Sequence, residues 1–210
     1  MRTTVLLAAL LFALSLSAQS NELGVFVTKP SFKTTSTTDP DIGQIKLAFD
    51  GKTGFGISLD HFTSPDSAVH ISAQRLSANS RIDAPAQGLS VGAGTMDLTE
   101  LTAALHWYFL SSRNMVRPYV GAGVARIQSG KLRIPAELTV SGAEETTSLD
   151  SKTTWTADAG VDIHIGTNGA ITVSAQYTPY KTHFGAAPDD PVQFLKLNPM
   201  TLAGGFRWRF

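Results

Sequence analysis

Hydrophobic and polar side chains alternate residue by residue along much of the chain, and the last segment shows this most clearly. Between Met200 and Phe210 every even-numbered position carries an apolar residue or glycine, whereas Arg207 and Arg209 stand among the odd-numbered positions. A repeat of two is typical of a β-strand with one apolar and one polar face. The same alternation recurs in three other segments, which are 98–109, 154–165 and 170–180. Helical periodicity is hard to find, so the pattern predicts an all-β protein.

Four weaker segments complete the set of predicted strands. They are 23–32, 55–60, 69–74 and 118–127. The last of these is rich in glycine and alanine, and the pattern leaves its facing open. The resulting total of eight strands is an even number, as expected of a barrel whose two chain ends lie on the same side of a membrane.

The connections between the predicted strands alternate strictly between short and long. Three short ones consist of turn-forming residues, around 64–67, 111–114 and 166–169. Four long, polar ones cover roughly 33–53, 78–96, 128–152 and 181–197. Outer-membrane barrels have short periplasmic turns and longer outer loops, whereas a soluble sandwich has no reason to follow this rule. We therefore predict an eight-stranded antiparallel transmembrane β-barrel with short periplasmic turns and long outer loops.

The first residues are typical of a secretory signal peptide. Arg2 precedes an apolar stretch, 5–16, and small residues suited to cleavage follow it. The stretch has about 12 residues, whereas a membrane-spanning helix needs roughly 20, which disfavours the alternative of an uncleaved anchor. We expect cleavage after Ala18, with nearby serines as alternatives. Residues 1–18 are then the signal peptide, and 19–210 form the barrel in the bacterial outer membrane.

Aromatic residues fall where a membrane barrel carries them. Trp107 and Phe109 end a predicted strand at the periplasmic rim, and Trp155 and Tyr177 lie toward the outer rim. Two belts of aromatic residues at the membrane interfaces are typical of outer-membrane barrels. The alternative is that these are core aromatics of a soluble sandwich. We favour the belts because the polar faces of the strands point inward.

Composition and charge exclude several functions. Lysine and arginine together number 17, as do aspartate and glutamate, so the formal net charge is zero. A neutral chain offers no basic face for nucleic acid. The absence of cysteine excludes a thiol zinc site, a disulfide and a lipidated N-terminal cysteine. We expect no cofactor.

The end of the chain resembles a known assembly signal. Phe206, Trp208 and Phe210 alternate up to the last residue, as in the C-terminal signal that the barrel assembly machinery recognises. More specifically, segment 197–210 resembles the end of the OmpW family. The segment Arg-Pro-Tyr-Val-Gly-Ala-Gly-Val at 117–124, which follows a strand ending His-Trp-Tyr-Phe, resembles the same family.

This resemblance implies an eight-stranded barrel with a narrow lumen that passes or binds small hydrophobic compounds. Members of the family are also linked to stress responses and to colicin or phage reception. The resemblance therefore favours a narrow channel or carrier for small hydrophobic molecules. The alternative is a non-conducting structural or receptor barrel whose outer loops bind partners or lipopolysaccharide.

Charged residues gather near the predicted periplasmic ends of the strands, and by parity most of them point inward. They are Glu22, Asp60, His70, His106, Asp162, His164, Arg207 and Arg209. Because the last strand must close against the first, we expect Arg207 and Arg209 to meet Glu22 and, across one strand, Asp162. An eight-stranded barrel is barely wide enough for its side chains, and buried charges need partners. A salt-bridged plug is therefore the favoured interpretation, and a gated polar constriction is the alternative.

The spacing of the histidines suggests neither catalysis nor metal binding. His70, His106 and His164 share a predicted level on different strands, and the first two can lie side by side. No short spacing such as His-Glu-x-x-His occurs. We therefore expect no metal site and no enzymatic activity.

Two features concern the outer half of the predicted barrel. Arg75 continues a lipid-facing parity, so it either contacts lipopolysaccharide phosphate or snorkels to the interface. Pro30 and Pro179 each remove a donor from the strand ladder. We therefore hypothesise a lateral gap in the outer half of the wall, through which an apolar ligand leaves into the membrane. Continuous strand pairing at both prolines would contradict this hypothesis.

Overall fold

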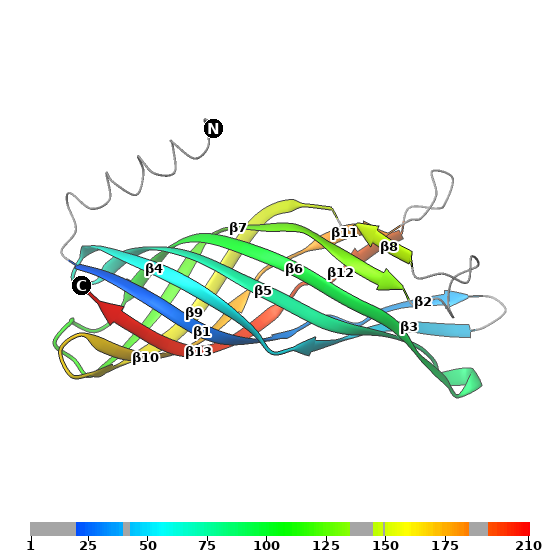
Figure 1. The fold of residues 1–210 in the computed structure, drawn as a ribbon, viewed down its shortest axis with the longest axis horizontal. Helices are drawn as coiled ribbons and strands as arrows, with labels where there is room; N and C mark the ends of the chain where they lie inside the picture. Colours follow the sequence, from blue (N-terminus) through cyan, green and yellow to red (C-terminus); the bar gives the residue numbers. More distant parts are fainter. Residues whose placement is uncertain (1–19, 40–42, 135–144, 149, 185–192) are drawn as a thin grey trace.

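A closed ring of eight antiparallel strands forms the body of the protein (Figure 1). The computed structural model describes residues 20–39, 43–134, 145–148, 150–184 and 193–210. The ring contains, in chain order, β1 (Ser20–Ser31), β4 (Gly54–Ser64), β5 (Ser67–Ala84), β6 (Leu89–Tyr108), β7 (Val116–Ile134), β9 (Lys152–Ile165), β10 (Gly169–Tyr177) and β13 (Met200–Arg209). The first and last strands close it, with Leu23 opposite Trp208. The predicted fold class is confirmed.

Short turns and the C-terminus lie at one end of the ring, which is the periplasmic end in the predicted orientation (Figure 1). Ser64 and Ser67 flank the turn between β4 and β5, and residues 166–168 join β9 to β10. Residues 109–115 join β6 to β7, and in this turn Asn114 donates its backbone N–H to the carbonyl of Ser111. All three turns lie where the sequence predicts them.

The connections at the opposite end are long, as predicted, and most of their described residues form strands. β5 and β6 stay paired up to Ala84 and Leu89, where a 3-10 helix, η1 (Pro85–Gln87), joins them. Five further strands lie at this end among the described residues. β2 (Thr35–Asp39) pairs with β3 (Gly43–Lys52), which pairs with β5. β8 (Glu145–Ser148) pairs with β7, and β11 (Lys181–Phe184) pairs with β12 (Gln193–Lys196). Hydrophobic alternation fades here because the outer faces no longer meet lipid, although the backbone ladders continue.

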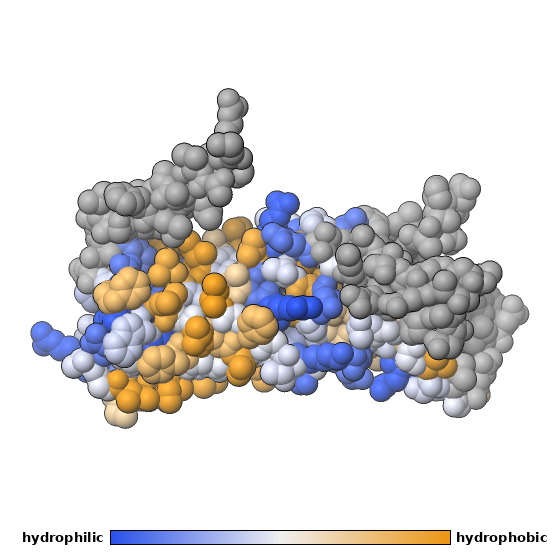
Figure 2. All heavy atoms as spheres, viewed as in Figure 1, coloured by the Kyte–Doolittle hydropathy of each residue, from blue (hydrophilic) through white to orange (hydrophobic). Residues whose placement is uncertain are grey.

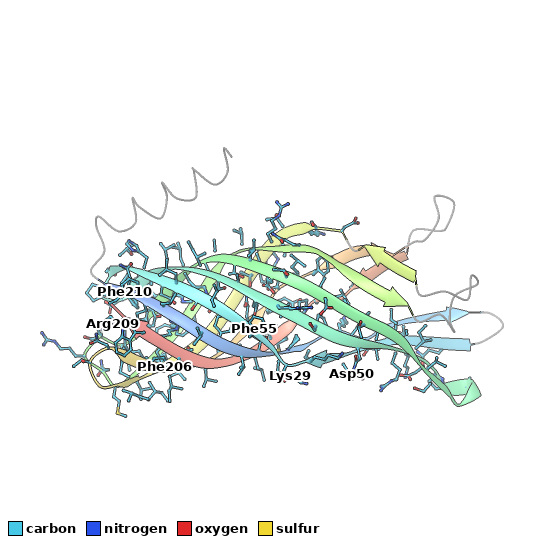
Figure 3. The ribbon with its side chains drawn as sticks, in the orientation of Figure 1. Lys29, Asp50, Phe55, Phe206, Arg209 and Phe210 are labelled. Atoms are coloured by element: carbon cyan, nitrogen blue, oxygen red, sulfur yellow. The ribbon has the colours of Figure 1, made fainter. Side chains whose placement is uncertain are left out.

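The barrel is apolar outside and polar inside along its periplasmic half. Leu105 exposes 68% of its surface, whereas Asp60 is fully buried. Figure 2 shows apolar residues gathered over the half of the molecule that carries the C-terminus, with hydrophilic residues beside them toward the other end. Lys29 and Asp50 lie beyond this apolar belt, on the outer side of Phe55 (Figure 3). The described ranges contain no helix long and apolar enough to cross a membrane.

The facing of β7, which the sequence leaves open, is given by the exposure of its side chains. Tyr119, Ala125 and Ile127 are buried, and Val120 and Val124 are exposed. Odd-numbered residues of this strand between Arg117 and Ile127 therefore point into the lumen.

An apolar cluster fills the lumen toward the outer end. Its buried members come from four strands and three connecting segments: Phe32, Phe49, Leu76, Ala78, Met96, Leu98, Ile127, Tyr180 and Leu197. We call this group the upper apolar cluster. Below it, toward the C-terminal end, the inward side chains become polar, and they form the candidate site.

Candidate functional site

Arg207 lies at the centre of the polar interior. Strand parity on β13 points its side chain inward, and it is buried. Its Nη1 donates to Tyr108 Oη at 3.0 Å and to Asp162 Oδ2 at 3.2 Å, and its Nη2 donates to Tyr119 Oη at 3.3 Å. Tyr108 also donates its hydroxyl hydrogen to Asp162 Oδ2, at 3.2 Å. A planar guanidinium with several donors suits such a buried network, which ties four strands together across the lumen.

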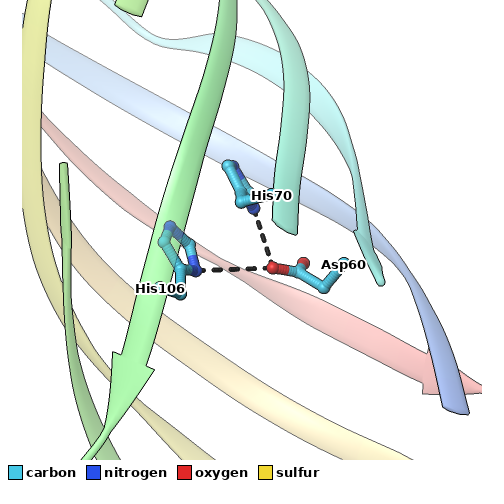
Figure 4. Close-up of side chains that lie close together, drawn as sticks. All are labelled: Asp60, His70 and His106. Atoms are coloured by element: carbon cyan, nitrogen blue, oxygen red, sulfur yellow. Dashed lines mark hydrogen bonds and ion pairs between the residues drawn. The ribbon is translucent and has the colours of Figure 1, made fainter. Parts of the chain in front are cut away.

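Asp60, His70 and His106 form a second group beside Arg207, on β4, β5 and β6 (Figure 4). Asp60 lies opposite His70 in the strand register, and Asp60 Oδ1 is 2.9 Å from His70 Nδ1 and 3.4 Å from His106 Nδ1. The two imidazole rings stack with their centroids 4.3 Å apart. On the far side, His106 Nε2 is 3.1 Å from Asp158 Oδ2, and Arg207 Nη1 is 3.4 Å from Asp60 Oδ2.

A third group closes the periplasmic end. Arg209 Nε donates to Glu22 Oε1 at 2.9 Å. Arg117 is buried with its guanidinium carbon 4.2 Å from the centre of the Tyr108 ring. Its Nη2 donates to the Pro65 carbonyl in the β4–β5 turn, at 2.7 Å. The end of the barrel is thus stabilised by ion pairing, stacking and contacts to turn carbonyls.

A further polar layer lies between these groups and the upper apolar cluster. Glu100 Oε1 accepts hydrogen bonds from Thr178 Oγ1 at 2.8 Å and from Gln176 Nε2 at 3.0 Å. Gln74 donates to Gln176 Oε1 at 2.9 Å. These side chains reach the lumen from β5, β6 and β10 and from the residue after β10. A buried carboxylate needs such donors, because burying it unpaired is costly.

A small polar cavity separates this layer from the Arg207 network. It has a volume of about 40 Å³, and His70, His106, Asp158, Ser72 and Thr172 are among the residues that line it. A space of this size and polarity holds on the order of two or three water molecules.

The eight charged residues predicted for the lumen do not form one cluster. The structure brings Arg207 together with Asp162, Asp60, His70 and His106, and it brings Arg209 together with Glu22. His164 lies apart from the other histidines. It lines a surface depression at the periplasmic end, together with Met115 and Arg209. The expected common level of three histidines is therefore wrong for His164, because its strand register places it next to the β9–β10 turn.

Sequence reasoning missed several members of the site. Tyr119 belongs to the predicted strand 118–127, whose facing the pattern leaves open, and Arg117 stands just before that strand, so the pattern assigns neither side chain a direction. Tyr108 and Asp158 share the inward parity of His106 and Asp162, and parity alone was the signal that could have found them. The partners Gln74 and Gln176 are joined across the lumen, which depends on the barrel diameter rather than on any spacing in the chain.

The aromatic residues predicted for the two belts point outward. Trp107, Phe109 and Trp155 each expose more than half of their surface, and Trp155 packs against Tyr177 with ring centroids 5.6 Å apart and ring planes tilted by 56°. The residues of the proposed assembly signal, Phe206, Trp208 and Phe210, also point outward on or just after β13, and two of them are labelled in Figure 3.

A closed antiparallel barrel with an outward apolar belt and buried ion pairs inside defines a transmembrane β-barrel of the outer-membrane class. The model of the outer membrane protein beta-barrel domain family matches residues 4–210. The chain belongs to this family and is a protein of the bacterial outer membrane. A comparison with curated proteins finds no match.

Solved structures show the same fold. The outer membrane protein OprG from Pseudomonas aeruginosa is 14% identical, with 92% of this chain and 97% of that chain covered and a TM-score of 0.67. The outer membrane protein AlkL, solved in lipid bilayers, is 16% identical, with 92% and 91% covered and a TM-score of 0.60. Neisserial surface protein A is 14% identical, with 90% and 97% covered and a TM-score of 0.54.

Proposed function

We propose that this barrel is a carrier of the OmpW type, which takes small hydrophobic molecules from the outer surface and releases them sideways into the membrane. The observation that carries the proposal is the upper apolar cluster. Leu76, Met96 and Leu98 are buried inside the outer half of the lumen, where an open aqueous pore would have polar walls. An apolar molecule that enters from the outer end meets a matching environment there.

The seam between β1 and β3 supports release through the wall. β1 pairs with β4 only up to Thr28, opposite Gly54, and among the described residues no ladder joins β1 to β3 above that point. Pro30 has no N–H to donate. The seam is bridged by Lys29 Nζ, which donates to the Gly51 carbonyl at 2.6 Å. Separating these strands therefore breaks fewer backbone hydrogen bonds than opening a paired wall does.

The pairing around both prolines limits where in the wall a lateral gap can lie. Pro30 remains paired with β13, opposite Thr201. Around Pro179, Thr178 donates its N–H to the Pro199 carbonyl, and Leu197 donates to the Tyr180 carbonyl. The wall is thus linked at Pro179, and of the two prolines Pro30 alone leaves an exit among the described residues, on its β3 side. A groove lined by Pro30, Phe49, Met200 and Leu202 lies there, and Phe49 belongs to the upper apolar cluster.

The lower polar layers favour lateral exit over passage through the floor. An apolar molecule moving downward would have to displace Gln176 from Glu100 and then Arg207 from Asp162. Each displaced buried group would lose hydrogen bonds that an apolar molecule cannot replace.

Uptake of a small apolar fluorescent probe by cells that produce the protein tests the proposal. We expect Phe49→Ala to change the uptake rate several-fold, because Phe49 belongs to the upper apolar cluster and also lines the groove. Phe55→Ala is the matched control, since Phe55 points outward and is 67% exposed. Equal uptake with and without the protein would overturn the carrier role. Uptake that rises in Arg207→Ala together with ion conductance would show passage through the floor instead.

A non-conducting receptor or structural barrel is the second candidate. It is favoured by the filled lumen and by the β5–β6 hairpin, which extends to Ala84 and Leu89, far beyond the apolar belt. Planar-bilayer recording separates the candidates in combination with uptake. A closed lumen with no probe uptake supports the receptor role, and a closed lumen with uptake supports the lateral carrier.

Three further roles are proposed for parts outside the lumen. Arg75, which is exposed and 3.3 Å from Asp97, faces the headgroup region of the outer leaflet, where lipopolysaccharide phosphate is its partner. Phe206, Trp208 and Phe210 bind the barrel assembly machinery. Residues 1–18, which lie outside the described residues, are removed as a signal peptide, and N-terminal sequencing of the protein from outer membranes tests this.

A further inference from the structure

We propose that Asp60, His70 and His106 bind one divalent transition-metal ion inside the barrel. The group offers one carboxylate oxygen and two imidazole nitrogens, and these three atoms lie within 4.8 Å of one another. Figure 4 shows both rings turned toward the same oxygen of Asp60. Imidazole and carboxylate donors of this kind suit Zn²⁺, Cu²⁺ and Ni²⁺.

The distances from Asp60 Oδ1 to the two imidazole nitrogens are close to those in a metal site. Ligands bound to a tetrahedral ion at 2.0–2.1 Å stand about 3.3 Å apart. Asp60 Oδ1 is 2.9 Å from His70 Nδ1 and 3.4 Å from His106 Nδ1. The first contact is an ordinary hydrogen bond, but the second is not one. The two ring nitrogens of the buried His106 each face a carboxylate oxygen, Nδ1 that of Asp60 and Nε2 that of Asp158, although neither contact meets the geometry of a hydrogen bond.

The surroundings of His106 suit a cation bound between the donors. Its Nε2 is 3.1 Å from Asp158 Oδ2, and metal-binding histidines usually donate their second N–H to a carboxylate in this way. With the proton on Nε2, the Nδ1 lone pair faces Asp60 Oδ1, and a metal ion bound between them would take the place of a proton on Nδ1. Arg207 Nη1 is 3.4 Å from the other oxygen of Asp60, and the metal would replace the contact that Oδ1 makes with His70 Nδ1.

The charges around the group also favour a divalent ion. Two buried carboxylates, those of Asp60 and Asp162, lie against the guanidinium of Arg207, and the partly buried Asp158 faces His106. With neutral histidines, these three carboxylates outnumber Arg207, and a divalent ion between the donors would lower the excess of negative charge. Arg209 is engaged by Glu22, whereas Arg117, which stacks on Tyr108, offsets part of this excess. The adjacent cavity, which His70 and His106 line, provides water for the remaining ligand position.

The sequence argues against this site because its three donors lie on three strands at spacings that match no metal motif. The register of β4, β5 and β6 brings them together. Asp60 lies opposite His70, and His70 lies opposite Ala104, two residues from His106 on β6. The inference is independent of the proposed carrier function.

Metal binding by the folded protein tests the proposal. The protein is isolated folded from outer membranes, treated with chelator, and titrated with Zn²⁺ and separately with Co²⁺. A second sample is refolded with Zn²⁺ present, because the cavity is enclosed. We expect about one equivalent of Zn²⁺ by elemental analysis and a visible Co²⁺ absorption band typical of a low-symmetry nitrogen and oxygen site.

Variants locate the ion. His70→Ala and His106→Ala should each weaken Zn²⁺ binding more than tenfold. His164→Ala should not change it, because His164 lies outside the group, at the periplasmic end of the barrel. Asp158→Asn should cost about 10–100-fold, as expected for a carboxylate that orients a ligand, and it remains informative if a histidine variant fails to fold. Heat-dependent electrophoretic mobility confirms folding. Less than a tenth of an equivalent in the refolded sample, or equal affinity in all four variants, would overturn the proposal.

Discussion

Arg207 donates to Asp162 at 3.2 Å although β10 lies between their two strands in the sheet. The bond therefore crosses the lumen rather than following the wall. Both side chains are buried, and Tyr108 bonds to each of them. This relationship makes the floor of the barrel a single connected network.

Replacing Arg207 by alanine should lower the free energy of unfolding by about 3–5 kcal/mol. Removing one partner of a buried ion pair leaves the other charge uncompensated, and here Asp60 and Asp162 both lose a partner. Urea unfolding in lipid vesicles measures the change. Arg81→Ala is the control, since Arg81 pairs with Asp83 and Asp50 at the exposed outer end and should cost less than about 1 kcal/mol. Equal losses for the two variants would contradict the connected floor.

Replacing Gln176 by alanine should destabilise the upper polar layer. Glu100 would lose a donor and Gln74 would lose its acceptor, and an unsatisfied buried polar group costs about 1–3 kcal/mol. The same unfolding assay applies. Ser174→Ala, two residues earlier on the same strand and lining the cavity, should change stability by less than about 0.5 kcal/mol. If Ser174→Ala is the more harmful change, the layer does not depend on Gln176.

Replacing Gly123 by alanine should also destabilise the barrel. A Cβ at this position would lie 2.1 Å from the Ala103 carbonyl oxygen of β6 and 2.5 Å from Ala104 Cα, so backbone would have to move. Overpacking of this kind costs about 1–3 kcal/mol. Gly204→Ala is the control, because a Cβ there meets nothing within 4 Å. Unchanged thermal unfolding of both variants would show that β7 has room to shift away from β6.

Replacing Phe210 by alanine should lower the amount of barrel in the outer membrane several-fold without lowering the stability of refolded protein. Its side chain is 66% exposed, so it adds little packing, and its backbone N–H still donates to the Asn21 carbonyl. Leu202→Ala changes an outward residue of the same strand and should leave the amount unchanged. Quantitative immunoblots of outer membranes measure both. A loss of refolded stability in Phe210→Ala would assign the residue a structural role instead.

The amino-acid sequence by itself determined the architecture. Alternation with a repeat of two residues indicates which side chains face lipid. Leu105 and Trp208, for example, point outward as that rule requires. Turn residues at Ser64–Ser67 and 166–169 set the strand count. These features depend on neighbours in the chain, because β-strand facing and turn formation are local properties.

Only the tertiary structure decided what occupies the lumen. Whether Gln74 reaches Gln176, or whether Asp60 meets two histidines and an arginine, depends on barrel diameter and on the register between strands. A shift in register would separate Asp60 from His70 without altering any local pattern. The tertiary structure also decided that strands continue beyond the membrane. Lipid no longer dictates the polarity of side chains there, so pairing with a neighbouring strand maintains these strands without hydrophobic alternation.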